Sequence, residues 1–360
     1  MKRTFIRRLD NLLRTNFKHF TSIDTRNNFK KWKAIKGQYA GRRVFLIANG
    51  PSLNVTPLYL LKNEYTIVFN RAQLILERLG YFPNFYMIAD GVVAENIRED
   101  IMYFVEKCDY SFVPDISKGD LVDFTSFLAH REKLLWMYEE PIRFSKCLPF
   151  VSPGNTVIFR AFQVLRYMGF EEVVVVGNDM NYVVHTTADV LKEEVVKGKV
   201  NQTIQSQKDD DPNHFDPRYF GKGKVYHQPS AQIVEKIFKN LDVVADEFRK
   251  SGTKVINAGY NSKVECFPKQ DFYECLGYSK KEIDDIFEEL VRDKGFGSRK
   301  EFLALATNTS ELWDDNRKIA AVSVTHAGDM IKSKIFDYLP VGPYEGKIYF
   351  INRKFLNQQH

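Results

Sequence analysis

The residues best suited to chemistry are polar groups that directly follow apolar runs. The run at 44–48 ends in Asn49, Gly50, Pro51 and Ser52. Gly50 has no Cβ and so lets the backbone approach a ligand closely, Pro51 favours entry into a helix, and Ser52 is a good helix cap. A strand that ends in such a turn leaves backbone N–H groups free, and these form a typical phosphate site. The turn predicts phosphate binding, with an ordinary βα turn as the alternative, since small Gly/Pro/Ser turns are common.

The other apolar runs of this region end in similar residues. Asn or Asp stands at nearly every run end, and one such ending means little, whereas five together suggest a shared polar cleft. The segments concerned are Asn70-Arg71, Asp90-Gly91, Ser152 to Asn155 with Gly154, Gly177 to Tyr182 with Asp179, and Asn257 to Tyr260.

Between 186 and 228 the hydrophobic pattern fails, and Lys, Asp, Gln and Asn crowd the chain. A loop of this length in a compact domain is usually a lid or a disordered segment. The run Asp209-Asp210-Asp211 looks like a metal-binding DxD motif, but a solvated acidic loop is the better interpretation because no strand leads into it. His214 and His227 both lie here, and His227 precedes an amphipathic helix, so we expect it at the mouth of the cleft.

Strand and helix patterns alternate through the region that carries these residues. Strands are predicted at 44–48, 65–70, 85–90, 110–114, 133–137, 172–177 and 254–257, and helices at 72–79, 156–168 and 231–250. This alternation predicts an α/β fold, a doubly wound and mostly parallel Rossmann-like sheet, although no GxGxxG fingerprint is present. Ligands of such sheets bind beyond the carboxyl ends of the strands, where the strand order switches.

Charge is distributed unevenly along the 360 residues. Residues 1–43 hold 13 Lys and Arg against 2 Asp and Glu, and the remainder holds 39 against 44. A slightly acidic body argues against nucleic acid as a partner. The four cysteines have no metal-ligand spacing, no run is long enough to span a membrane, and the start lacks a secretory h-region, so we expect a cytoplasmic protein.

Three regions are predicted. Residues 1–40 form a basic amphipathic arm, and 1–36 could lie on an anionic membrane surface or pack on the body or a sister subunit. Residues 41–270 form the Rossmann-like domain that carries the expected cleft, with a lid at about 186–228. Residues 271–360 form a small helical extension headed by capping boxes at Ser279–Glu282 and Ser298–Glu301, followed by a tail with a β-like run at 347–351. An oligomer contact or docking surface is the expectation for this last region.

The motifs at 48–53, 69–71, 151–156, 175–182, 213–215, 227 and 255–259 come in an order that resembles the MptE-like domain, named for archaeal 6-hydroxymethylpterin pyrophosphokinases. The layout is also similar to that of bacterial sialyltransferases of glycosyltransferase family 42. The resemblance covers roughly 38–270, and its most specific parts are the ANGPSL turn and the Gly177-x-Asp179 strand end. The chain departs from the sialyltransferase pattern at Ala48, Pro153 and Asn181.

The resemblance implies roles for individual residues. Asn49 to Ser52 would wrap the nucleotide phosphate, Asn70 would contact nucleotide or sugar, and Ser152 and Gly154 would line the sugar pocket. His227 matches the general base, with His214 as its competitor, and Tyr182 is a candidate for stabilising the leaving phosphate. The remaining strand-end residues (Asp90, Asn155, Gly177, Asp179 and Asn257) are expected in the same cleft.

Three functions remain open. The first is an inverting glycosyltransferase that moves an acidic sugar from a CMP-activated donor to a glycan or glycolipid acceptor and requires no metal. The second is an ATP- and Mg²⁺-dependent pterin pyrophosphokinase-like enzyme, in which Asp90 and Asp179 would hold the metal. The third is a non-catalytic nucleotide- or glycan-binding module, which would suit the basic arm and the C-terminal extension.

Overall fold

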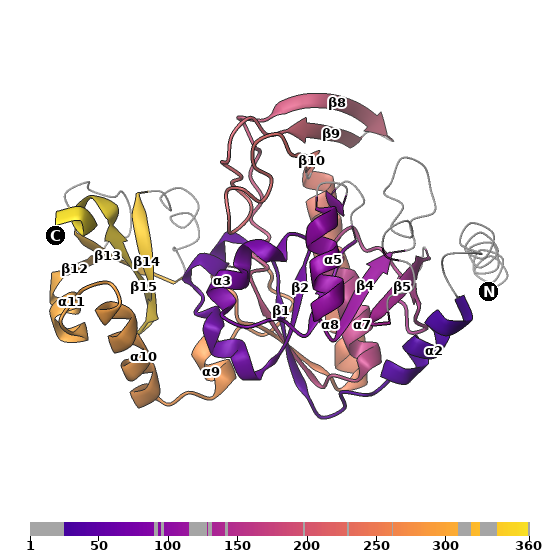
Figure 1. The fold of residues 1–360 in the computed structure, drawn as a ribbon, viewed down its shortest axis with the longest axis horizontal. Helices are drawn as coiled ribbons and strands as arrows, with labels where there is room; N and C mark the ends of the chain where they lie inside the picture. The colour runs from indigo at the N-terminus through magenta and orange to yellow at the C-terminus, as the bar shows by residue number, and fades with distance from the viewer. Residues whose placement is uncertain are drawn as a thin grey trace.

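The computed structural model describes residues 25–89, 93–94, 97–114, 128, 132–140, 143–196, 199–228, 230–260, 262–308, 318–324 and 337–358. Its centre is an eight-stranded parallel sheet with the order β11-β7-β1-β2-β3-β4-β5-β6 (Figure 1). The strands are β1 (Arg43–Ile47), β2 (Tyr65–Phe69), β3 (Phe85–Met87), β4 (Tyr110–Pro114), β5 (Leu134–Glu139), β6 (Phe150–Val151), β7 (Glu172–Val176) and β11 (Lys254–Asn257). The predicted doubly wound fold is confirmed, and the short strand β6 is the one member that the sequence pattern did not predict.

The strand order reverses between β1 and β7. From β1 the chain winds outward through β2 to β6, then returns to place β7 on the other side of β1, with Phe45 paired to Val174 and Thr66 on its two flanks. The carboxyl ends of β1 and β7 therefore form the switch point at which doubly wound sheets bind ligands.

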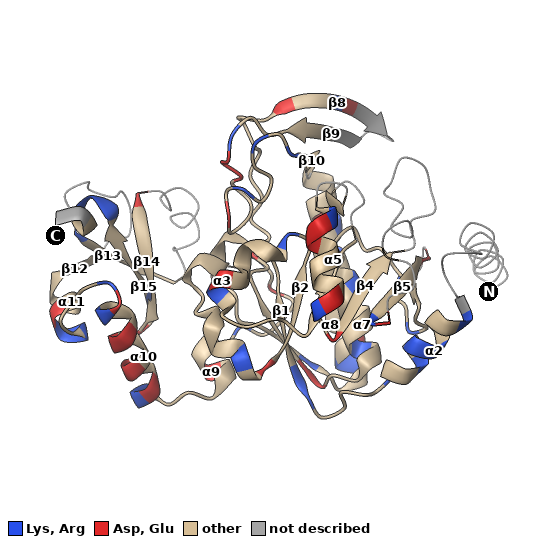
Figure 2. Cartoon of the chain, viewed as in Figure 1, with Lys and Arg blue, Asp and Glu red and all other residues tan. Residues whose placement is uncertain are grey.

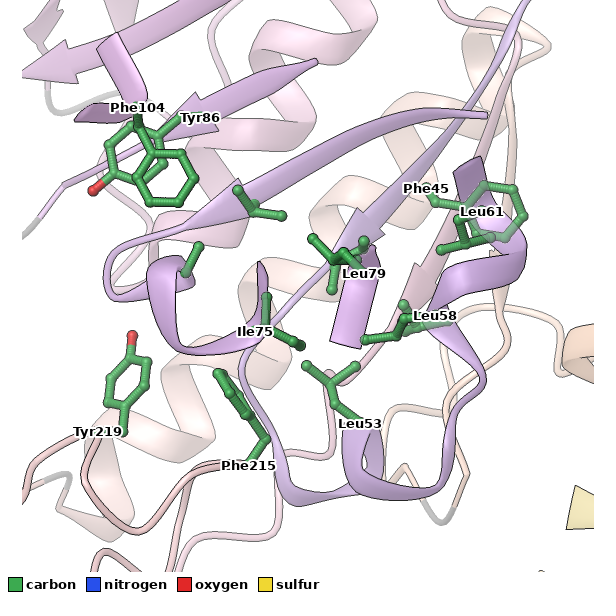
Figure 3. Packing of buried hydrophobic residues seen from close by; sticks show 14 of the residues in the cluster. Phe45, Leu53, Leu58, Leu61, Ile75, Leu79, Tyr86, Phe104, Phe215 and Tyr219 are labelled. Atoms are coloured by element: carbon green, nitrogen blue, oxygen red, sulfur yellow. The ribbon is translucent and has the colours of Figure 1, made fainter. Parts of the chain in front are cut away.

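Apolar helices cover both faces of the sheet, because its strands are buried on both sides. One face packs against α2 (Thr25–Ile35), α7 (Val157–Met168) and α8 (Ala231–Ser251). The other packs against α3 (Leu76–Leu79), α5 (Arg98–Lys107) and the 3-10 helices η1 (Pro51–Val55), η2 (Leu58–Asn63) and η3 (Ala72–Ile75). Figure 3 shows Phe215 and Tyr219 of the lid beside this second cluster, to which both belong.

Helix α2 lies within the segment predicted as an arm and packs on the body, which was one of the two alternatives. Asn28 exchanges hydrogen bonds with the backbone of Trp136, through Nδ2 at 3.0 Å and Oδ1 at 2.9 Å, and Trp32 Nε1 donates to the same carbonyl at 2.9 Å. Trp32 and Ile35 are each 1% exposed. Residues 25–35 are therefore part of the body, because their apolar face closes one face of the sheet. The apolar positions expected in the arm, Phe5 to Phe20, lie outside the described residues.

The lid region is folded and is not a structureless loop. It contains an antiparallel sheet of β8 (Asp189–Val196), β9 (Lys199–Gln205) and β10 (Val225–Gln228), in the order β10-β9-β8, which stands beyond the central sheet in Figure 1. The sequence pattern missed these strands because they carry polar residues on both faces. No periodic apolar signal marks such strands.

The C-terminal region also contains more strand than predicted. After α9 (Phe272–Leu276), α10 (Lys280–Arg292) and α11 (Arg299–Leu305), a sheet forms from β12 (Ala306–Asn308), β13 (Ile319–Ser323), β14 (Tyr338–Tyr344) and β15 (Lys347–Asn352), followed by η4 (Arg353–Gln358). The capping box at Ser279 and the β-like run are confirmed. Val322 and Ile348 join the core cluster that contains Phe45, so this region packs on the body.

No helix in the described ranges is both long and apolar enough to cross a membrane.

Candidate functional site

A cavity of about 520 Å³ opens at the switch point. It is lined by the ends of β1 and β2, the segments after β3 and β7, the start of α7 with the residues before it, and the lid. These parts lie far apart in the sequence and meet because parallel strands end at the same edge of the sheet.

Most of the predicted site residues line this cavity. They are Asn49, Gly50, Pro51, Asn70, Asn155, Gly177, Asp179, Tyr182, His214 and His227. Four others are not among its lining residues: Ser52, Ser152, Gly154 and Asn257. Asp90 lies outside the described residues.

The turn after β1 is closed by the segment after β7. Gly50 N donates to Gly177 O at 2.7 Å, and Ser52 N donates to Asp179 Oδ2 at 2.8 Å. The Ser52 hydroxyl donates to the other Asp179 oxygen. Two backbone amides that the sequence left free for a phosphate are therefore already engaged.

The structure gives a different reason for glycine at position 50 from the one expected. Its φ of −71° is open to any residue, so the turn itself does not require glycine. A Cβ at this position would lie 2.5 Å from Gly177 O and 2.6 Å from Asp179 Cγ. The missing side chain makes room for the neighbouring strand end as well as for the cavity.

The residues behind the cavity support its walls. Gln163 holds Ser152 by accepting from its N–H and donating to its carbonyl, both at 2.9 Å. Asn240 Nδ2 donates to Gly154 O at 2.7 Å, and Asn257 Nδ2 donates to Val264 O at 2.9 Å. These bonds fix the turn before α7 and the loop after β11.

The base of the lid is anchored to the central sheet. Phe215 N donates to Asn49 O at 3.0 Å, and Arg71, after β2, donates to the carbonyls of Arg218 and Tyr219. Phe215 is 0% exposed. This burial holds residues 211–220 at the cavity.

Within this anchored segment, Asp211 and His214 form a close pair. His214 Nδ1 lies 2.7 Å from Asp211 Oδ2, and the His214 ring stacks on Tyr219 with 3.9 Å between centroids and 3° between planes. Burial raises the pKa of Asp211. The charge and hydrogen bond of His214 and the amides of Asn213 and Phe220 lower this pKa by more, so that it lies below its usual value. A proton on Nδ1 that Asp211 accepts leaves Nε2 as a hydrogen-bond acceptor.

His227 has different surroundings. It lies on β10, not at the start of α8, and its side chain is exposed. Nδ1 lies 3.2 Å from Thr203 Oγ1, and no carboxylate in the described part of the chain orients the ring. His227 lines the cavity but lacks the carboxylate partner that His214 has.

The three aspartates of the run 209–211 each have a different structural partner. Asp209 Oδ1 accepts from Lys222 N at 2.8 Å, whereas Asp210 accepts from Thr187 Oγ1 at 2.7 Å and lies 3.0 Å from His185 Nε2. His185, which is 5% exposed, also bonds to the Tyr226 hydroxyl. The run expected to be a solvated loop is thus held by hydrogen bonds to other parts of the lid. His185 could not be identified from the sequence, because no periodic pattern marks its segment.

Two further polar residues line the cavity and were not named individually from the sequence. Arg160 on α7 is 8% exposed; it donates to Ala89 O at 3.1 Å and pairs with Glu139. Asn178 is 5% exposed, and its Nδ2 has no hydrogen-bond partner among the described residues. Arg160 is a charged member of an apolar helical stretch, which was the available signal, whereas Asn178 lies within the strand-end segment 177–182 that was assigned to the cleft.

The carboxylates do not gather as a metal site in the part of the chain that the structure describes. No group of three or more His, Cys, Asp or Glu side chains there is placed to hold an ion. Asp179, one of the two metal ligands expected for a pyrophosphokinase, accepts from Ser52.

Comparisons with known proteins add little. No family model matches the sequence, and no curated protein matches it. One solved structure, the MAf glycosyltransferase from Magnetospirillum magneticum AMB-1, is similar with a TM-score of 0.40 and 12% identity. The match covers 86% of this chain and 50% of the other, so this chain spans about half the length of that protein. A similarity this weak assigns no activity.

Proposed function

We propose that this chain is a glycosyltransferase that moves an acidic sugar from a CMP-activated donor to a hydroxyl of a surface glycan. The observation that carries the proposal is the Asp211–His214 pair, which faces a cavity at the switch point of a doubly wound sheet. An imidazole oriented by a carboxylate is a typical general base for a hydroxyl nucleophile.

The reaction is a single displacement at the anomeric carbon. His214 Nε2 accepts the proton of the acceptor hydroxyl while the acceptor oxygen bonds to that carbon. The bond from the carbon to the phosphate oxygen breaks, and CMP leaves with the electron pair. Because attack and departure occur on opposite faces, the configuration inverts. Asp211 holds the Nδ1 proton and stabilises the imidazolium that forms.

The geometry favours His214 as the base over His227. Asp211 is 1% exposed at its side chain and engages His214 directly, whereas the partner of exposed His227 is the Thr203 hydroxyl. A base without an orienting acceptor is positioned less well, and proton transfer requires good positioning.

Two variants test the function. His214→Ala should lose transfer by roughly 10²- to 10⁴-fold while still binding the donor, since the base contacts the acceptor. His227→Ala is the matched control and should retain most of its activity. Full activity in His214→Ala, or loss confined to His227→Ala, would refute the assignment of His214.

A ligand screen separates the wider alternatives. Thermal stability is measured with CMP, CMP-sugars, UDP and ATP, each with and without Mg²⁺, because a ligand stabilises the fold that binds it. Stabilisation by CMP-sugars without Mg²⁺ supports the proposal. Stabilisation by ATP only with Mg²⁺ would support the pyrophosphokinase instead, and binding without turnover of any acceptor would support a binding module.

We also propose contact with an anionic membrane surface. Residues 25–43 carry seven Lys and Arg and no Asp or Glu. Figure 2 shows Lys and Arg along α2, and Arg26, Lys30 and Lys33 surround a shallow hollow that also includes Phe29. Because α2 is fixed to the sheet, this basic surface has a defined position on the body.

A further inference from the structure

The first turn of α7 faces the cavity without a side-chain cap. Thr156, Val157 and Ile158 all line the cavity, and the N-cap Thr156 has extended backbone (φ −155°, ψ 147°) with no capping hydrogen bond from its side chain. The first N–H groups of an α-helix have no intrahelical acceptor, and the helix dipole gives this end a partial positive charge.

Arg160 brings a guanidinium, which is paired with Glu139, to the same place. Among the described residues that line the cavity it is the sole Lys or Arg. Its hydrogen bond to Ala89 O and its ion pair with Glu139 fix the guanidinium at the ends of β3 and β5. A guanidinium held in this way is preorganised for an anion.

A second and independent feature is Asn178, which lies in the segment after β7 and not on α7. Its Nδ2 is buried, has no hydrogen-bond partner among the described residues, and belongs to a residue that lines this cavity. An unsatisfied buried donor is unfavourable by roughly 1–3 kcal/mol, so native proteins seldom keep one without a ligand or water to accept from it. Asn178 therefore indicates that the occupant of the cavity presents an acceptor.

The two carboxylates of the cavity wall already accept hydrogen bonds from protein groups. Asp179 accepts from Ser52, and Asp211 accepts from His214 and two backbone amides. The cavity is thus polarised, with both carboxylates on the β7 and lid sides and hydrogen-bond donors at α7.

We infer that the N-terminal turn of α7, together with Arg160 and Asn178, is an anion subsite that takes a phosphoryl group. This inference rests on the proposed function, which supplies a nucleotide phosphate as the ligand. It places that phosphate at α7 and away from the turn at Asn49, whose Gly50 and Ser52 amides are engaged by β7. A carboxylate has the same acceptor chemistry, and the experiment distinguishes the two.

The test removes one amide hydrogen and leaves the helix in place. Proline is well tolerated at the first position of a helix, and the extended Thr156 is compatible with a following proline. Val157→Pro should weaken CMP binding by roughly 10-fold or more, as expected for a lost hydrogen bond to a charged group, and should leave cytidine binding unchanged. Ala231→Pro makes the same backbone change at the first residue of α8, which does not line the cavity, and should bind CMP like the parent. Val157→Ala keeps the N–H while it trims the side chain, so its CMP affinity measures the part of any loss that belongs to the side chain.

Two further measurements complete the test. Asn178→Asp, which replaces a donor by a negative charge, should also lower the ratio of CMP to cytidine affinity. Inorganic phosphate should compete with CMP, and acetate should not; the opposite order would overturn the phosphoryl assignment. An unchanged CMP to cytidine ratio in folded Val157→Pro would overturn the subsite.

Failure of the subsite differs from failure of the function. Normal sugar transfer with normal CMP binding in Val157→Pro removes the subsite and leaves the enzyme assignment standing. Phosphate-dependent binding that is lost in Val157→Pro, in a protein that transfers no sugar, supports the subsite and removes the proposed function.

Discussion

Asp179 accepts hydrogen bonds from both the amide and the hydroxyl of Ser52, a residue 127 positions earlier in the chain. The pair joins the segments that follow β7 and β1, the two strands on either side of the switch point. Lys263 N also donates to Asp179 O at 3.0 Å, which ties in the loop after β11. One acidic residue therefore aligns three strand ends beneath the cavity.

Asp179→Asn should destabilise the fold by about 1–3 kcal/mol. The new side-chain amide places an NH₂ group where a carboxylate oxygen accepted from Ser52, so one of the two Ser52 donors loses its acceptor. Chemical denaturation measures the loss. Ser52→Ala removes the partner hydroxyl, so the double variant should lose less than the sum of the two single losses. Strict additivity would show that the two side chains are not coupled.

Gly50→Ala should also lower stability, by roughly 1–3 kcal/mol, because the new Cβ meets Gly177 O at 2.5 Å and that atom belongs to backbone. Gly259→Ala is the control, since its nearest atom is a side-chain oxygen at 3.3 Å. Denaturation midpoints of the two variants are compared. Equal stability would mean that the two strand ends move apart without cost.

Asp211→Asn should reduce transfer by roughly 10²- to 10⁴-fold, with CMP affinity nearly unchanged. An amide N–H facing Nδ1 favours the tautomer in which Nε2 carries the proton. In that tautomer Nε2 cannot take the proton of the acceptor hydroxyl. Asp209→Asn is the matched control, because Asp209 accepts from the Lys222 amide and not from a histidine. Comparable losses in both variants would indicate a general effect on the lid.

The lid should loosen in acid. The pKa values of Asp210 and Asp211 are lowered in the folded protein, because hydrogen bonds and the nearby histidines outweigh the rise that burial causes. A lowered folded pKa contributes stability above the unfolded pKa of about 4, and this contribution is lost as the pH falls through the folded pKa. The hydrogen-exchange protection of residues 205–228, measured relative to the intrinsic exchange rate at each pH, should therefore fall below about pH 4. Asp211→Asn should weaken that dependence, and an unchanged profile would contradict the role of Asp211.

If α2 contacts the membrane, reversing its positive charges should weaken binding to anionic vesicles. Triple substitution Arg26→Glu, Lys30→Glu and Lys33→Glu should lower cosedimentation with phosphatidylglycerol vesicles by roughly 100-fold or more, at about 1 kcal/mol for each removed charge. The control Lys236→Glu, Lys281→Glu and Lys300→Glu changes three exposed lysines elsewhere and gives the same net charge. Equal binding by both triple variants would locate the contact away from α2.

The central sheet and the residues at its edge could be predicted from the sequence. Strands such as β1 and β7 are buried on both faces, so they are continuous apolar runs, and that signal is local. Because parallel strands end at one edge, the residues after those runs could be assigned to a common cleft, and eight of them line the cavity.

Which groups are available for chemistry depends on how the chain folds in space. The sequence places His214 and His227 in the same polar segment, and only the fold gives one of them Asp211 and leaves the other exposed. Likewise, the amides of Gly50 and Ser52 are engaged only because β7 returns beside β1. Hydrogen-bond partners more than a hundred residues apart leave no periodic trace in the chain, because they depend on how the strands are ordered in space.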